Sequence, residues 1–119
     1  VKIYGHMWTI RALNQGDLIT AFNDIQDDGS AALGKMSTLV LSQIAYAIDA
    51  MDGVPVYEWF PDLIKRAEFN TTEEFKMAVR RIVRRYLEKM PADILKEFDN
   101  AYATIEKKRN EAIAELKKS

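Results

Sequence analysis

TTEEFKMAVRRIVRRYLEKM, residues 71–90, is followed by Pro91 and then by ADILKEFDNAYATIEKKRNEAIAELKKS, residues 92–119. In both stretches apolar residues recur every three or four positions, a spacing typical of amphipathic α-helices. Thr71 and Glu74 form a capping box for the earlier helix. Pro91 ends that helix and can open the later one. The second half of the chain therefore predicts two long helices.

The later helix would be about 40 Å long, at 1.5 Å per residue. Its last part, residues 106–119, is mostly charged. We expect residues 106–119 to project from the globular part of the protein or to bind a second copy of the chain.

The first half predicts a small β-hairpin and two further helices. Alternating apolar residues within 1–12 predict the hairpin, with its turn at Gly5–His6. Asn14 is expected to cap a first helix, which stops at Asp27–Gly29. A second helix, from Ser30 to about Met51, is apolar on most sides and is expected to be central.

Two features are predicted between the central helix and residue 71. Residues 54–57 can add an edge strand to the hairpin. Pro61 suits the first turn of a short third helix that runs through Ala67. The fold class is therefore mainly α, with about five helices and an N-terminal β-hairpin. We expect residues 1–119 to form a single domain.

Composition is that of an ordinary globular domain. The 119 residues are 48% hydrophobic and 29% charged, with a net charge of −1. The charge is uneven, because residues 1–60 carry three basic and seven acidic side chains, whereas residues 61–119 carry fourteen and eleven. This polarity could steer one end of the molecule toward a partner of opposite sign.

The sequence contains little that could perform covalent chemistry. It has no cysteine and one histidine, His6, which is placed in the hairpin turn. Residues 29–36 nearly match a phosphate-binding loop, but Met36 stands where that loop needs a hydroxyl for magnesium. Asp24 begins a segment similar to a calcium loop, yet Lys35 takes the place of its bidentate glutamate. We expect no enzymatic activity, no metal and no cofactor.

Ten residues are candidates for binding a partner. Four arginines with helical spacing predict a basic ridge, which can bind phosphates or an acidic protein surface or can form a structural ion-pair face. Two aromatic residues ahead of Pro61 would mark a binding patch if they are exposed. Four apolar residues continue the stripe of the last helix. The candidates are Arg80, Arg81, Arg84, Arg85, Trp59, Phe60, Tyr102, Ile105, Ile113 and Leu116.

The opening sequence V-K-I-Y-G-H-M-W-T-I-R-A-L-N-Q-G-D is similar to the start of the tail assembly chaperones of long-tailed bacteriophages. In that family a short strand pair is often followed by I-R-x-L-(T/N)-x-x-(D/E) at the step into a helix. Here the matching residues are Ile10, Arg11, Leu13, Asn14 and Asp17. Residues 48–56 resemble the family's I-D-G-x-P-V-like turn, with Ala50 and Met51 intervening. Residues 90–102 fit its (L/M)-P-x-x-(I/V)-(L/V)-x-x-(L/F)-x-x-x-Y pattern.

The resemblance implies a mainly helical, non-enzymatic protein that acts in the cytoplasm of the infected host. Such chaperones coat the tape-measure protein, recruit tail-tube subunits and can oligomerise. Two alternatives remain open at this stage. One is a nucleic-acid-binding or packaging accessory protein that uses the basic ridge, which the near-neutral net charge disfavours. The other is a structural protein of the head–tail junction.

Overall fold

The structure, a computed structural model, describes residues 1–27 and 35–118. In chain order they form β1 (Lys2–Ile3), β2 (His6–Ile10), α1 (Gln15–Asp27), α2 (Lys35–Ala47), β3 (Ile48–Met51), β4 (Val54–Pro55), two 3-10 turns (Val56–Glu58 and Arg66–Glu68), α3 (Thr72–Glu88) and α4 (Ala92–Lys118). The protein is mainly helical with a small antiparallel sheet, which confirms the predicted class. The near match to a phosphate-binding loop, residues 29–36, and the predicted cap at Ser30 lie mostly outside the described residues.

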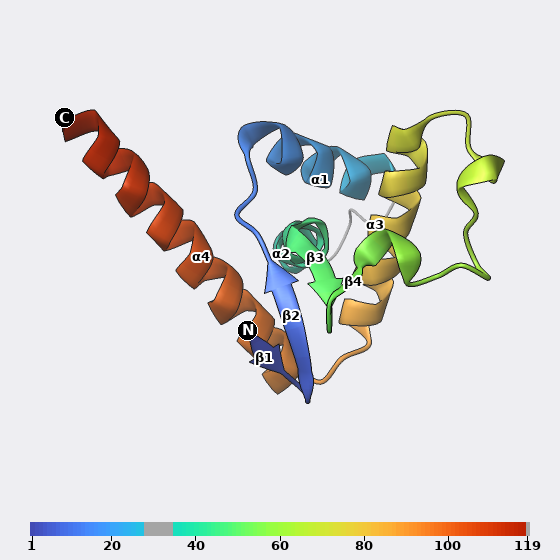
Figure 1. The fold of residues 1–119 in the computed structure, drawn as a ribbon, viewed down its shortest axis with the longest axis horizontal. Helices are drawn as coiled ribbons and strands as arrows, with labels where there is room; N and C mark the ends of the chain where they lie inside the picture. Colours follow the sequence, from blue (N-terminus) through green and yellow to red (C-terminus); the bar gives the residue numbers. More distant parts are fainter. Residues whose placement is uncertain (28–34, 119) are drawn as a thin grey trace.

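Helix α2 is the centre of the molecule. It contacts α1, α3 and α4, which surround it in Figure 1, where α2 is seen end-on. Ile44, Ala45 and Ala47 are at most 1% exposed. The burial follows from a helix that is apolar on most sides, because each apolar side then needs a neighbour.

The predicted extent of this central helix, Ser30 to Met51, is wrong at its C-terminal end. The helix ends at Ala47, and residues 48–51 form strand β3, which pairs with β2 and β4. Residues 48 and 51 would face opposite sides of a regular strand. An extra residue in β3, where the pairing with β2 shifts register, places Ile48 and Met51 on the same side, so apolar residues three apart fit a bulged strand as well as a helix. Helical spacing over so short a run therefore cannot distinguish the two.

The predicted third helix, Pro61 to Ala67, is also wrong. Pro61 opens only a turn, in which the Ile64 amide donates to the Phe60 carbonyl at 3.0 Å. The backbone is extended at Lys65 before the short 3-10 turn at 66–68. A helix this short depends on burying an apolar face, and Leu63 is 65% exposed. The described residues thus contain four α-helices, not five.

The sheet is larger than the predicted hairpin. Its order is β1-β2-β3-β4, and every neighbouring pair is antiparallel. Both hairpins turn through two residues with positive φ, Tyr4–Gly5 and Asp52–Gly53. That backbone suits a type I′ turn, for which Asp-Gly is a favoured pair. Of the edge strand expected at residues 54–57, only Val54–Pro55 is a strand, β4, and it joins β3 and not the N-terminal hairpin, whereas residues 56–58 form a 3-10 turn.

The two hairpin turns are held together by one carboxylate. Asp52 accepts a hydrogen bond from the Met7 amide at 2.8 Å, and its other oxygen lies 2.7 Å from Nδ1 of His6. His6 therefore has a neighbouring carboxylate, from a residue 46 positions away in the sequence. The Met7 amide, followed by His6, lowers the pKa of Asp52 below its ordinary value.

We expect an NMR titration to find the Asp52 carboxyl titrating below pH 3.8. The stability that this bridge contributes is present above that pH and is lost as the pH falls through the lowered pKa. In a His6→Ala variant the pKa should rise only in part, because the Met7 amide remains. If the pKa of Asp52 returned fully to its ordinary value, the Met7 amide could not be the larger of the two causes.

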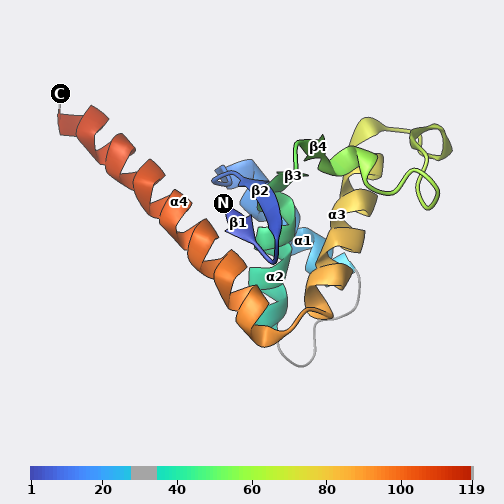
Figure 2. The same ribbon diagram turned by 60° about the horizontal axis from the view of Figure 1, so that its bottom comes forward.

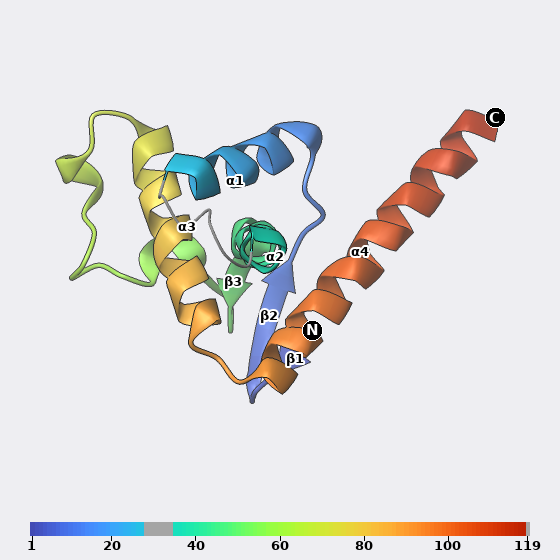
Figure 3. The same ribbon diagram turned by 180° about the vertical axis from the view of Figure 1, so that it is seen from behind.

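Helices α1, α3 and α4 begin where the sequence places them. The Thr71 hydroxyl accepts from the Glu74 amide at 3.1 Å, and the Asn14 side chain likewise accepts from the Asp17 amide at 2.8 Å. Pro91 separates α3 from α4. The C-terminal part of α4 extends away from the other elements, as Figures 2 and 3 show from two sides.

Candidate partner-binding surfaces

The four arginines of α3 do not form one exposed ridge. Arg80 and Arg84 are each 2% exposed, Arg81 is half-buried and only Arg85 is exposed. The prediction of a continuous basic surface on α3 is therefore wrong for Arg80 and Arg84. Arg80 and Arg84 lie beside the buried Val79 and Val83, and they fit the alternative of a structural ion-pair face.

Arg80 closes the C-terminal end of α2. Its guanidinium donates to the carbonyls of Ala45, at 2.9 Å, and of Ile48. It also donates to the Tyr57 hydroxyl, at 3.0 Å from Nη2. The last carbonyls of a helix lack partners within it and carry partial negative charge, so a cation at this place is favourable. Arg80 thus joins α2, α3 and the start of the 56–58 turn.

A second ionic cluster joins α1 to α3. Asp24 is 1% exposed, accepts from Nε of Arg81 and lies 3.7 Å from Nη1 of Arg84. Asp24 therefore acts as an internal anion and not as the first ligand of an exposed calcium loop. Burial, followed by the negative charge of Asp24, raises the pKa of the nearby Tyr46 phenol.

The two aromatic candidates lie in an apolar pocket, which we call the aromatic pocket. It has a volume of about 300 Å³. Its lining comes from the sheet, the 56–60 segment and α3, and consists of Trp8, Ile48, Met51, Trp59, Phe60, Val83, Tyr86, Leu87 and Met90. No lining residue is charged. The sequence suggested Trp59 and Phe60 but gave no sign that Tyr86, from α3, would join them.

The rings of the aromatic pocket are ordered by contacts with one another. Trp8 and Trp59 meet edge to face, with centroids 5.9 Å apart, and Phe60 stacks on Tyr86 at 5.6 Å. Both indole N–H groups donate to backbone carbonyls, that of Trp8 to Ile3 and that of Trp59 to Val54. The pocket therefore presents ring surface without an unsatisfied indole donor. Tyr86 is 51% exposed and forms part of the rim.

The four candidates on α4 fall into two environments. Tyr102 is 6% exposed and Ile105 is half-buried, so both help to attach the helix. Burial, followed by Glu106, raises the pKa of Tyr102 to about 12. Ile113 and Leu116 lie on the projecting part and are 42% and 75% exposed. Only these last two remain as candidates for direct contact with a partner.

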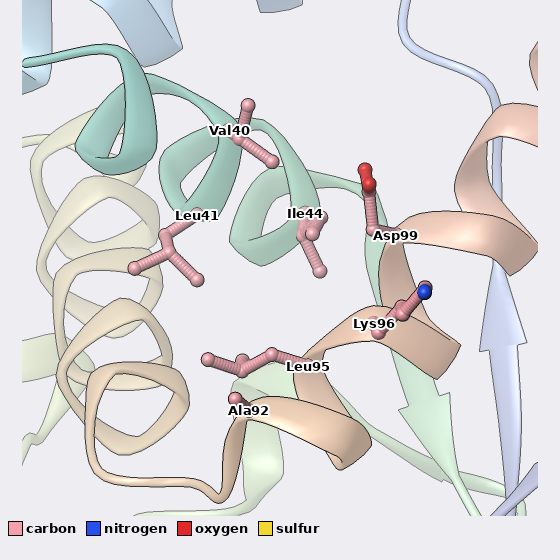
Figure 4. Close-up of a pocket in the computed structure, with 7 residues that line it drawn as sticks. All are labelled: Val40, Leu41, Ile44, Ala92, Leu95, Lys96 and Asp99. Atoms are coloured by element: carbon pink, nitrogen blue, oxygen red, sulfur yellow. The ribbon is translucent and has the colours of Figure 1, made fainter.

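A groove runs between α2 and α4. Near the start of α4 it forms a hollow of about 380 Å³, lined by Val40, Leu41, Ile44, Ala92, Leu95, Lys96 and Asp99. Figure 4 shows Leu41 and Leu95 facing one another across it. A second hollow, farther along α4, shares Val40 and Asp99 with the first and reaches Ala114. We call the two together the α2–α4 groove.

The described residues contain no group of three or more His, Cys, Asp or Glu side chains able to hold a metal ion. No helix among them is both long and apolar enough to cross a membrane. Comparisons with protein-family models, with curated proteins and with solved structures find no match.

Proposed function

We propose that this protein is a non-enzymatic tail assembly chaperone, which binds the tape-measure protein of a long-tailed bacteriophage and recruits its tail-tube subunits. The observation that carries the proposal is the aromatic pocket, a concave apolar surface with no charged side chain in its lining. Such a surface is suited to an apolar side chain of a partner protein. The resemblance in sequence supplies the identity of that partner.

The aromatic pocket has the composition of a protein-binding hot spot. Trp and Tyr are enriched at such positions, because they offer large rigid surfaces with a polar atom already satisfied. Met51 and Met90 add flexible side chains that can adapt to more than one apolar group. A helical client can insert one large side chain from its apolar stripe into a pocket of this size. The tape-measure protein, as an elongated helical client, would present such side chains repeatedly.

Nucleic-acid binding has less support than protein binding. That hypothesis depended on four exposed arginines, and two of them are buried within the protein. A phosphate backbone would have to be held by Arg85 and the half-buried Arg81. Few phosphate contacts give weak binding at physiological salt.

Variants Phe60→Ala and Tyr86→Ala are expected to weaken client binding by about tenfold to a hundredfold, because each removes one of the two stacked rings. Calorimetric titration with the tape-measure protein from the same genome would measure this effect. Phe22→Ala is the matched control, because Phe22 is a 40% exposed aromatic on α1, outside the pocket. Equal affinities for all four proteins would remove the aromatic pocket from the proposal.

Gene order and particle composition test the assignment independently. We expect the gene to lie directly between those of the tail-tube and tape-measure proteins, and the protein to be absent from purified particles. Presence in mature particles would instead favour a structural protein of the head–tail junction.

A further inference from the structure

On the side of α4 that borders the α2–α4 groove, positive and negative residues alternate in such an order that two antiparallel copies of the helix would place opposite charges next to each other. Lys96, Asp99, Ala103, Lys107 and Glu111 follow one another along this side. Glu106 also lines the groove, but its carboxylate lies beside Tyr102 of its own helix. The other charges nearest to Ala103 are Asp99 and Lys107, each four residues away. The next are Lys96, seven residues before, and Glu111, eight residues after. At both steps the two charges are opposite in sign.

A second α4, laid antiparallel and aligned at Ala103, would therefore meet an opposite charge at each of these positions. Asp99 of each chain would face Lys107 of the other, and Lys96 would face Glu111. Each kind of pair would occur twice, once on either side of the two-fold axis. This reciprocity is what a symmetric interface between identical chains requires.

None of Lys96, Asp99, Lys107 and Glu111 forms an ion pair with another residue that the structure describes. All four side chains are exposed. They are therefore free to pair with another molecule, and opposite charges across an interface fix its register more than its affinity.

Apolar and small residues along the same side can supply the affinity. Alanine at position 103 permits close approach of two helix axes at the centre of the contact. In the same alignment Ala114 of the second chain meets Ala92 of the first. Ile113 is five helical turns beyond Leu95 and so projects in the same direction. Its neighbour across the interface would be the hollow lined by Val40 and Leu41.

We propose that two copies of this chain associate through antiparallel α4 helices, each lying in the α2–α4 groove of the other. The contact covers Val40 and Ile113, which are 37% and 42% exposed in the single chain. It leaves the aromatic pocket open, because none of that pocket's lining residues borders the groove. The association is therefore independent of the proposed client binding.

Charge exchange tests this pairing. Asp99→Lys places lysine opposite Lys107 twice in a homodimer, and Lys107→Asp places aspartate opposite Asp99 twice. Each variant alone should dimerise about tenfold or more weakly than the wild-type chain, because like charges face one another. An equimolar mixture of the two variants restores both opposite-charge pairs. The mixture should therefore dimerise with nearly wild-type affinity.

Sedimentation velocity from about 1 µM to about 1 mM would give the dissociation constants. Lys108→Asp is the matched control, because Lys108 is an exposed lysine next to Lys107 that borders a different hollow, beside β1. It should dimerise like the wild-type chain. Circular dichroism of every variant establishes that α4 remains folded.

Three results would overturn the pairing: a wild-type chain that stays monomeric throughout this range, single variants that dimerise normally, or a mixture that stays monomeric.

Discussion

The Arg80→Ala variant is expected to lose about 3–5 kcal/mol of unfolding free energy, because several acceptors each lose a hydrogen bond from a charged donor. Arg80 is 2% exposed and donates to two carbonyls at the end of α2 and to the Tyr57 hydroxyl. Alanine would leave those acceptors buried without a donor, and it would also leave a cavity. Urea denaturation followed by circular dichroism measures the loss.

Two variants show whether the effect comes from these contacts. Arg85→Ala changes an exposed arginine on the same helix and should alter stability by about 0.5 kcal/mol or less. Arg80→Lys keeps the positive charge but offers a single ammonium in place of the planar guanidinium that reaches several acceptors. It should therefore recover only part of the lost stability. An Arg80→Ala protein as stable as Arg85→Ala would show that α2 needs no cation at its end.

The inward position of arginines on α3 is indicated by another residue of the sequence, Asp24. Asp24 lies on the buried side of α1, with Ala21 three residues before it and Ile25 after it. A carboxylate on a buried helix face needs a positive partner, because burying an isolated charge is too costly. Asp24 therefore implied that at least one arginine would point inward. The sequence could not show that α3 would provide it, since the contact spans 57 residues.

Strands β3 and β4 are indicated by the turn between them. Asp52–Gly53 is a preferred two-residue hairpin turn, and it follows directly on the predicted end of the central helix at Met51. A hairpin turn at this place predicts a strand on each side of it, and β3 and β4 lie there. The starts of α1, α3 and α4 can be predicted from the sequence because their determinants are local, within three or four residues of one another. The aromatic pocket could not be recognised so easily, because Trp8, Trp59 and Tyr86 come from three distant segments.

The second large effect is expected at Phe98, which attaches α4 to the rest of the protein. Its side chain is fully buried, and its ring meets that of Trp8 edge to face with centroids 4.9 Å apart. Phe98→Ala should cost about 3–5 kcal/mol of unfolding free energy, because it removes apolar burial and leaves a cavity that the surrounding helices fill only in part. Hydrogen exchange should show the largest loss of protection in α4 and β2.

Leu116→Ala is the control for Phe98→Ala, because it truncates an apolar residue of the same helix that is 75% exposed. Its effect on the stability of the single chain should be within about 0.5 kcal/mol. The contrast between the two variants separates the parts of α4. The segment near Phe98 stabilises the fold, whereas the segment near Leu116 contributes little to it. Equal destabilisation by both variants would mean that the projecting end of α4 is packed against the body of the protein in solution.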